Sequence, residues 1–116
     1  MPDPITNLHT GTETQSGATA VIGIPNNQII GLFVNVSAVS GTLPSLSVIL
    51  QHSPNLTDWY DVPNAGGTIT LTGLSAVGLY SFYPSVGQPC LDNIRLSWTI
   101  GGIDPSFTFS ADLGTY

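Results

Sequence analysis

Apolar and polar residues alternate with a period of two along much of the chain, which is the pattern of half-buried β-strands. Segments 28–39 and 45–52 show it first, and segments 91–100 and 106–112 show it most clearly. The residues expected to face the core in these four segments are Ile30, Leu32, Val34, Val36, Ala38, Leu46, Val48, Leu50, Ile94, Leu96, Trp98, Ile100, Phe107, Phe109 and Ala111. Trp98, the largest of them, then needs a hydrogen-bond partner for its indole N–H.

Turn signals divide the rest of the chain into shorter strands. The 13 glycines and 9 prolines are spread throughout, and β-branched residues dominate between them, so helix is disfavoured. Further strands are predicted at 18–24, 58–62, 68–72 and 78–83. In the adjacent pair Trp59-Tyr60, alternation points one ring inward, and we expect it to be Trp59. About eight strands in 116 residues predict an all-β fold: a single-domain antiparallel β-sandwich or jelly roll.

Residues 1–16 are interpreted as an extended N-terminal arm that precedes the β-sandwich domain of residues 17–116. The segment contains Pro2, Pro4 and Gly11, and its only large apolar side chains after Met1 are Ile5 and Leu8. Such an arm either frays or lies on a neighbouring molecule. In the second case Ile5 and Leu8 belong to a partner interface.

Charge is the most unusual property of the composition. Only 7% of residues are charged, the formal net charge is -6, and Arg95 is the only Lys or Arg. A nucleic-acid binder needs several basic side chains to displace counterions from phosphates, and an anionic membrane surface requires the same. Both partners are therefore excluded. No apolar run approaches the roughly 18 residues of a spanning helix, and the first residues, Met1 to Pro4, do not resemble a signal peptide.

Candidate catalytic and metal-binding groups are scattered. Cys90 lies between Pro89 and Leu91 without a basic neighbour to activate it, so it is interpreted as a small apolar residue. Neither His9 nor His52 has a carboxylate or cysteine at metal-ligand spacing. A calcium site at the two aspartates of segment 58–61 lacks the further oxygen ligands that such a loop gathers. Asp58 is interpreted as a turn residue and Asp61 as a solvated strand residue. We expect no enzyme activity, no metal and no cofactor.

Arg95 faces outward by alternation on its strand, and we expect it to pair with an aspartate of the same or a neighbouring subunit. The alternative is an ordinary surface charge, for which an ion pair is worth about 0–1 kcal/mol. Phe33, Tyr80 and Tyr83 are further candidates for an exposed partner interface.

Two segments resemble small β-sandwich structural proteins of tailed bacteriophages. In 46–62 a strand ending in Gln51-His52-Ser53-Pro54 leads through a polar turn to the return strand of Trp59. In that family a strand ending in Gln-x-Ser-Pro is followed in the same way. Residues 91–109 are similar to the family's closing hairpin, and the resemblance covers about residues 32–112. The sequence departs at Asn55-Leu56, where the pattern commonly has Asp-Gly, which implies a longer or different turn.

The resemblance implies a virion component: a capsid decoration (cement) protein, a fibre or spike module, or a tail protein. Small size and the expected arm favour decoration. The chain would then be a homo-oligomer, with a trimer favoured, made in the host cytoplasm and bound to the major capsid protein or another virion protein on the capsid surface. The rival interpretation is a carbohydrate-binding or receptor-adhesion module. A glycan platform needs two or three exposed rings in one plane or cleft, which Phe33, Tyr60, Tyr80 and Tyr83 would provide.

Overall fold

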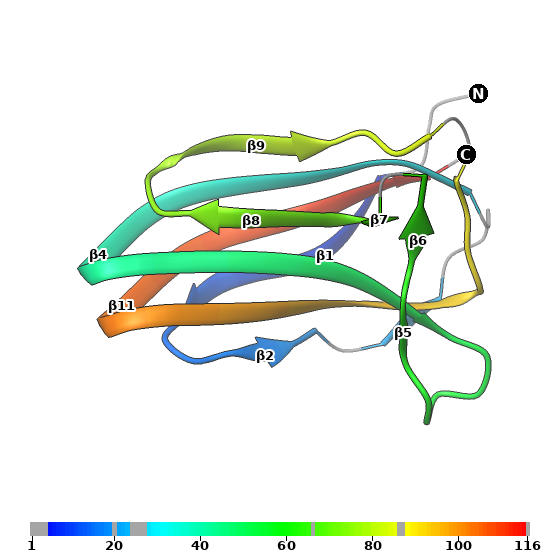
Figure 1. The fold of residues 1–116 in the computed structure, drawn as a ribbon, viewed down its shortest axis with the longest axis horizontal. Helices are drawn as coiled ribbons and strands as arrows, with labels where there is room; N and C mark the ends of the chain where they lie inside the picture. Colours follow the sequence, from blue (N-terminus) through cyan, green and yellow to red (C-terminus); the bar gives the residue numbers. More distant parts are fainter. Residues whose placement is uncertain (1–4, 20, 24–27, 66, 86–87, 116) are drawn as a thin grey trace.

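Two long strands organise the molecule. The computed structural model describes residues 5–19, 21–23, 28–65, 67–85 and 88–115, and all their regular structure is strand, as predicted. Strand β4 (Gln28–Ser53) and strand β11 (Asn93–Thr115) pair antiparallel along nearly their whole length. The pairing begins at Asn93 with Ser53 and ends at Thr115 with Ile29. Figure 1 shows this two-stranded ribbon bending back on itself at one end of the molecule.

The bend is a corner built from the same motif in both strands, Gly-x-x-Pro. Strand β4 contributes Gly41-Thr42-Leu43-Pro44 and strand β11 contributes Gly102-Ile103-Asp104-Pro105. The two glycines have φ of 109° and 116°, and the residues before the prolines, Leu43 and Asp104, have φ of 50° and 49°. A Cβ on Gly41 would lie 2.7 Å from the Asp104 carbonyl oxygen, and one on Gly102 would lie 2.8 Å from that of Leu43. Only glycine combines this backbone with so close an approach, so the glycines allow the corner.

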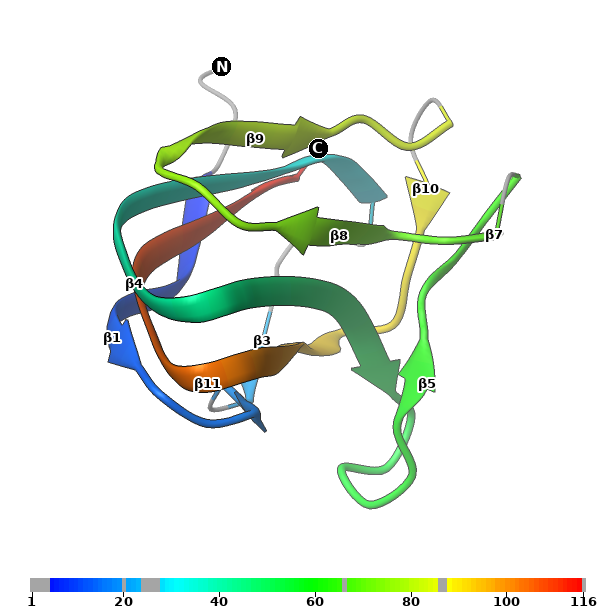
Figure 2. The same ribbon diagram turned by 60° about the vertical axis from the view of Figure 1, so that its left-hand side comes forward.

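The corner folds one hydrogen-bonded sheet into two layers (Figure 2). Layer one has the order β1, β11 (106–115), β4 (28–40) and β9. Layer two has β2 and β3, then β11 (93–101), β4 (45–53), and β8 with β5. Each layer therefore has four adjacent strand positions, and β4 and β11 each run from one layer into the other. This arrangement is a jelly roll. The shorter strands are β1 (Ile5–Glu13), β2 (Gly17–Ala18), β3 (Ile22–Gly23), β5 (Tyr60–Asp61), β6 (Pro63–Asn64), β7 (Gly67–Thr68), β8 (Thr70–Leu74), β9 (Gly78–Phe82) and β10 (Gln88–Pro89).

The core lies between the layers and contains most of the side chains that alternation placed there. Twelve of the fifteen predicted residues are buried; the others, Ile30, Ala38 and Ile100, are not. Register shifts explain two of these errors. One follows Gly114, where Ile29 is fully buried in place of Ile30, and another lies between Thr108 and Phe109, beyond which Ala38 turns outward. A bulge shifts the alternation by one residue, so that the other set of alternate positions faces the core beyond it.

Trp98 has the partner that its burial requires. Its side chain is 6% exposed, and its indole Nε1 donates a hydrogen bond of 2.8 Å to the Gln15 carbonyl oxygen. Gln15 precedes β2, so this bond fixes the chain between β1 and β2 against β11. The prediction that this indole needs a partner is confirmed.

The interpretation of residues 1–16 as a fraying or neighbour-bound arm is wrong for residues 5–13. These form β1, which pairs antiparallel with β11 from Ile5 opposite Gly114 to Glu13 opposite Phe107. Leu8 is 6% exposed and belongs to the core, not to a partner interface. The pairing has a register shift between Asn7 and His9, which interrupts the alternation by which the strand would have been recognised. Residues 1–4 lie outside the described part of the chain.

Two other expected segments differ in extent. The strand predicted at 18–24 is two short strands, β2 and β3, both paired with β11; residues 20 and 24 are not among those described. The turns expected at 40–44 and 101–105 are the corner itself, across which pairing between β4 and β11 continues. Strands 58–62, 68–72 and 78–83 correspond to β5, to β7 with β8, and to β9.

Candidate functional site

The outer side of layer one exposes an apolar surface. Leu32 and Val34 point into the core, so Phe33 between them points outward, opposite Asp112 of β11 and Ser81 of β9. In the same way Leu79 points outward because its neighbour Tyr80 packs against the core. Strand alternation therefore carries residues from three strands to one surface.

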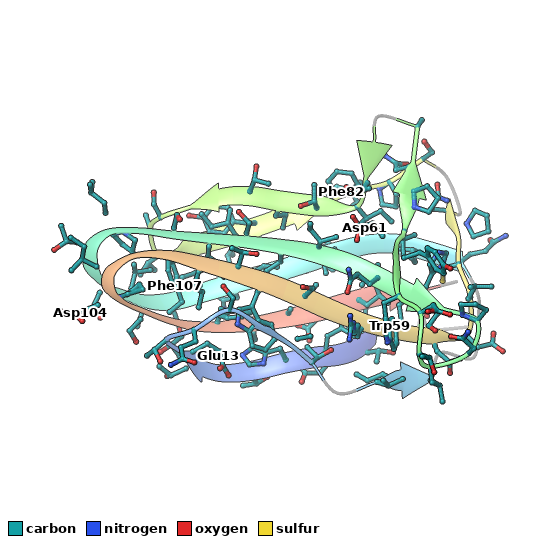
Figure 3. The ribbon with its side chains drawn as sticks, turned by 60° about the horizontal axis from the view of Figure 1, so that its bottom comes forward. Glu13, Trp59, Asp61, Phe82, Asp104 and Phe107 are labelled. Atoms are coloured by element: carbon teal, nitrogen blue, oxygen red, sulfur yellow. The ribbon has the colours of Figure 1, made fainter. Side chains whose placement is uncertain are left out.

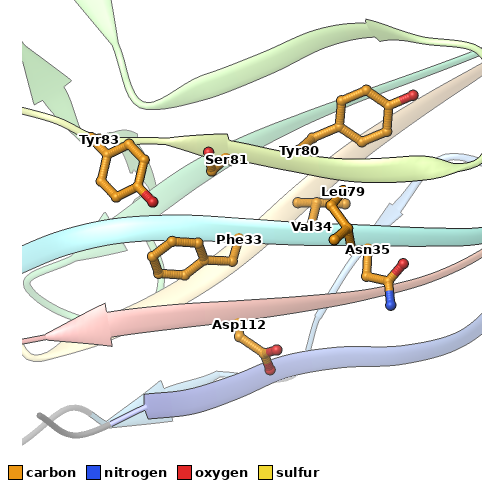
Figure 4. Close-up of a pocket in the computed structure, with 8 residues that line it drawn as sticks. All are labelled: Phe33, Val34, Asn35, Leu79, Tyr80, Ser81, Tyr83 and Asp112. Carbon is orange, nitrogen blue, oxygen red and sulfur yellow. The ribbon is translucent and has the colours of Figure 1, made fainter.

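Aromatic rings and a shallow hollow form the centre of this surface (Figure 4). The rings of Phe33 and Tyr83 meet edge to face, with centroids 5.6 Å apart and an interplanar angle of 77°. Leu79 is 83% exposed, Tyr83 67% and Ile5 62%. The hollow has a volume of about 360 Å³ and is lined by Phe33, Val34, Asn35, Leu79, Tyr80, Ser81, Tyr83 and Asp112. We call Ile5, Phe33, Leu79, Tyr83 and Asp112 the apolar face.

The lack of a side chain at Gly114 leaves room for Phe33 and Ile5 on either side of it. A Cβ added to Gly114 would lie 3.4 Å from Phe33 Cε2 and 3.7 Å from Ile5 Cδ1. Both side chains therefore flank Gly114, so Ile5 of β1 continues the surface begun by Phe33 of β4.

Asp112 is the only charged residue that lines the hollow. Its Oδ1 accepts a hydrogen bond of 2.8 Å from Asn7 Nδ2. The other polar lining groups are the neutral side chains of Asn35 and Ser81 and the Tyr hydroxyls. Neutral groups cost less to desolvate than ions, so the face is suited to being covered.

The structure brings together four of the six residues predicted for a partner interface: Phe33, Tyr80 and Tyr83 line the hollow, and Ile5 continues the same surface. Tyr80 is half-buried, and its hydroxyl donates a 2.7 Å hydrogen bond to the Ala76 carbonyl oxygen, so its ring lies at the edge of the face. Leu8 is in the core, and Arg95 lies on the other layer. Leu79 was not among the predicted interface residues, although Leu79 and Tyr80 are adjacent on one strand and alternation points one of the two side chains outward.

A second group of side chains surrounds Arg95 on the outer side of layer two. Arg95 Nε donates a 2.9 Å hydrogen bond to Gln51 Oε1, and Gln51 Nε2 donates one of 3.0 Å to Asp61 Oδ1. The guanidinium carbon lies 4.4 Å from the centroid of the Trp59 ring. We call Gln51, Trp59, Asp61 and Arg95 the arginine face. Figure 3 shows Trp59 at the end of the molecule opposite Asp104 and the corner.

The expectation that Trp59 points into the core is wrong. Its side chain is half-buried and stacks with Arg95, which faces outward between the buried Ile94 and Leu96. Cation–π contacts of this kind contribute about 0.5–1 kcal/mol at exposed sites. The Trp59 ring therefore covers the outer surface of the sheet, where it stacks against the Arg95 guanidinium.

The loop before Trp59 is held by its own side chains. Asn55 Oδ1 accepts hydrogen bonds from the backbone N–H groups of Thr57 and Asp58 at 3.0 and 2.8 Å, and Asn55 Nδ2 donates to Asp58 Oδ2 at 2.9 Å. Asp58 is thus a turn residue, as interpreted from the sequence. Leu56 has φ of 65°, which is the conformation that the glycine of the common Asp-Gly pattern adopts without strain.

The histidines and the cysteine serve the packing. The His9 ring lies between Trp98 and Phe109, at centroid distances of 4.8 and 4.4 Å, and its Nε2 is 3.6 Å from Glu13 Oε2. His52 Nδ1 accepts a 3.2 Å hydrogen bond from the Leu91 N–H, and desolvation lowers the pKa of this imidazole.

Cys90 is 8% exposed. Burial, with the nearby Asp92 charge, raises the pKa of its thiol to about 11. The interpretation of Cys90 as a buried apolar residue is confirmed, because such a thiol is a poor nucleophile. Within the described ranges, no three His, Cys, Asp or Glu side chains gather in a way that could hold a metal ion, and no helix there is long and apolar enough to cross a membrane.

No protein-family model and no curated protein sequence matches the chain. Solved structures do match. The SPBc2 prophage-derived protein YomS has a TM-score of 0.51 at 8% identity, over 98% of this chain and 94% of that one. The infectious bursal disease virus VP2 subviral particle has a TM-score of 0.52 at 15% identity, over 97% and 32%. Xylanase10C from Cellvibrio japonicus, in complex with xylopentaose, has a TM-score of 0.53 at 10% identity, over 96% and 22%. At such identities the likeness establishes a shared β-sandwich fold.

Proposed function

We propose that this chain is a non-enzymatic virion structural protein, and specifically a decoration (cement) protein that binds and stabilises a phage capsid. The observation that carries the proposal is the apolar face. A rigid sheet presents Ile5, Leu79 and Tyr83, all more than half exposed, around a hollow with one carboxylate. Exposed apolar surface of this kind marks a site of association.

The composition supports the same role. A surface made of hydroxyls and amides, on a chain with 7% charged residues, loses little hydration when a neighbour covers it. A decoration protein adds binding free energy to the mature shell that the expanded or unfolded shell does not receive. The shared fold with a prophage-derived protein and with a viral particle protein is consistent with this proposal, and the resemblance of segments 46–62 and 91–109 to phage proteins adds to it.

The ring geometry favours a protein partner over a glycan. The rings of Phe33 and Tyr83 are 77° apart rather than coplanar, and the Trp59 ring is stacked on Arg95. A flat sugar platform needs rings that lie in one plane, whereas edge-to-face packing is a preferred arrangement of aromatic pairs, and aromatic side chains are enriched at the core of protein contacts.

The test is co-sedimentation with heads purified from the phage that encodes the chain. We expect saturable binding, with a heat-stability gain for the decorated heads. The double variant Leu79→Ser/Tyr83→Ser should bind far less, because it removes two of the exposed apolar contacts. Val77→Ser is the matched control: Val77 is 62% exposed but lies in the β8–β9 turn, outside the apolar face.

Full binding by the double variant would refute the assignment of the apolar face. Absence of binding by the unaltered protein would refute decoration. Retardation of the protein by a polysaccharide in affinity electrophoresis, without head binding, would establish the glycan-binding alternative.

A further inference from the structure

We propose that the apolar face of one copy docks on the arginine face of a second copy, so that Arg95 of one molecule meets Asp112 of the next. The contact is head-to-tail, and it requires no capsid. It would occupy the same apolar face that the proposed function assigns to a capsid, so one copy uses this face for one partner at a time. Self-association of the isolated protein and head binding are therefore measured separately.

The fold places the two halves of this contact on opposite sides of one molecule. Asp112 points outward from layer one because its neighbours Ala111 and Leu113 are fully buried, and Arg95 points outward from layer two because Ile94 and Leu96 are fully buried. Both residues belong to β11, which passes through the two layers on either side of the corner. Each copy thus carries one face of each kind, which is the requirement for a heterologous interface.

Charge and the covering of the apolar face together favour this pairing over the two symmetric ones. Arg95 is the only Lys or Arg in a chain of net charge -6. Two apolar faces in contact would oppose two Asp112 carboxylates. Two arginine faces would bring two guanidinium groups together, each with an Asp61 of the other copy within its face, but such a contact would leave the apolar face uncovered. Contact between unlike faces instead brings the only such cation to a carboxylate, and like charges brought together cost several kcal/mol.

Both charged groups are already oriented in the free molecule. Gln51 accepts from Arg95 Nε and Trp59 supports the guanidinium plane, while Asn7 donates to Asp112 Oδ1. The two terminal amino groups of Arg95 are the donors that the Gln51 bond does not use, and guanidinium binds carboxylates through such pairs. Orientation before contact reduces the entropy lost on association.

An apolar centre completes the interface. The hollow beside Asp112 has a volume of about 360 Å³ and is walled by Phe33, Leu79 and Tyr83. Buried aromatic and arginine side chains at the centre of a contact supply most of the binding free energy. The arginine face brings both kinds of group, Trp59 and Arg95. It also contains Asp61, whose Oδ1 is engaged by Gln51 Nε2.

Sedimentation velocity and light scattering on the isolated full-length protein test the proposal. We expect the unaltered chain to associate, either as an open series or as a closed ring. Arg95→Glu and Asp112→Arg should each weaken association by about thirtyfold or more, as for the loss of a partner in a buried charge pair.

Mixing the two variants gives the decisive result. Arg95→Glu retains the apolar face with its Asp112, and Asp112→Arg retains the arginine face with its Arg95. An equimolar mixture should therefore recover association, although neither variant associates alone. Ser75→Arg, an added charge in the exposed β8–β9 turn and outside both faces, should associate as the unaltered chain does.

Circular dichroism and thermal unfolding establish that each variant is folded. If Asp112→Arg does not fold, Asp112→Asn preserves the acceptor for Asn7 and should still weaken association. A monomeric unaltered chain at all concentrations would overturn the proposal. So would a mixture of folded variants that stays monomeric, or dissociation by Arg95→Glu with no effect of Asp112→Arg, which would indicate a symmetric contact through Asp61.

Discussion

The corner between the layers gives a stability prediction that can be worked from the structure. Gly41→Ala and Gly102→Ala each place a Cβ on backbone with φ of 109° or 116°, a region that costs a non-glycine residue about 1–3 kcal/mol. Each Cβ would also lie within 3.0 Å of three backbone atoms, and relief of such overlap costs about a further 1–3 kcal/mol. We therefore expect losses of about 2–6 kcal/mol in the free energy of unfolding, against a total of about 5–15 kcal/mol.

Other glycines separate the two contributions. Gly67 has φ of 132° but open space around its Cβ position, so Gly67→Ala should cost only the backbone part, about 1–3 kcal/mol. Gly23 has open space and no positive φ, so Gly23→Ala should be neutral or stabilise by up to about 1 kcal/mol. The double variant Gly41→Ala/Gly102→Ala should cost less than the sum of the single variants, because one opening of the corner relieves both overlaps.

Urea unfolding followed by tryptophan fluorescence measures these differences. In thermal unfolding, the melting temperature should fall by about 8 °C or more for either corner variant, at about 4 °C per kcal/mol for a domain of this size. The reasoning is refuted if Gly102→Ala costs no more than Gly67→Ala, because the close approach of β4 and β11 would then contribute nothing.

Three further outcomes follow from single side chains. Leu56→Gly should change stability by less than about 1 kcal/mol despite losing a large side chain, because it relieves the left-handed backbone. Asn55→Ala should destabilise by about 0.5–1.5 kcal/mol, because water replaces the acceptor of two exposed N–H groups; urea titration of both variants checks these values. The lowered pKa of His52 means that the unfolded chain binds a proton at this imidazole more readily than the folded chain does. The contribution of His52 to folding stability is therefore fully present above pH 6.5 and is lost as the pH falls through the folded-state pKa. A His52→Asn variant should lose less stability than the unaltered protein between pH 7.5 and 5.5, which urea unfolding at the two pH values measures. Cys90, with its pKa of about 11, should resist a thiol reagent at pH 8 in the native state and react on unfolding; rapid native labelling would contradict its burial.

Period-two patterning was enough to predict the fold class and most of the core. It located β4 and β11 because Leu46, Val48, Leu50 and their partners alternate without interruption. It failed where a bulge changes parity, as at Ile29, because the register depends on the partner strand rather than on local sequence. It failed for β1 because a register shift near Leu8 breaks the alternation.

The candidate site was predictable only in part for a related reason. Alternation places Phe33 and Arg95 on outer surfaces, and aromatic content singled out Tyr83. That Ile5, Phe33 and Tyr83 share one surface follows from β1, β4 and β9 lying in one layer, which requires the corner and the order of strands. The stacking of Trp59 on Arg95 depends on the conformation of the loop that leads from β4 to β5, and no periodicity encodes it.

The continuity of β4 and β11 has a consequence for how the chain folds. Their ladder joins residues 40 apart at one end and more than 80 apart at the other, and each strand serves both layers, so neither layer can close alone. Folding must wait for this long-range pairing, and relaxation times of milliseconds to seconds are expected for such a topology. Strand β1 pairs with β11, so we expect it to be ordered late, by addition to a ribbon that already exists.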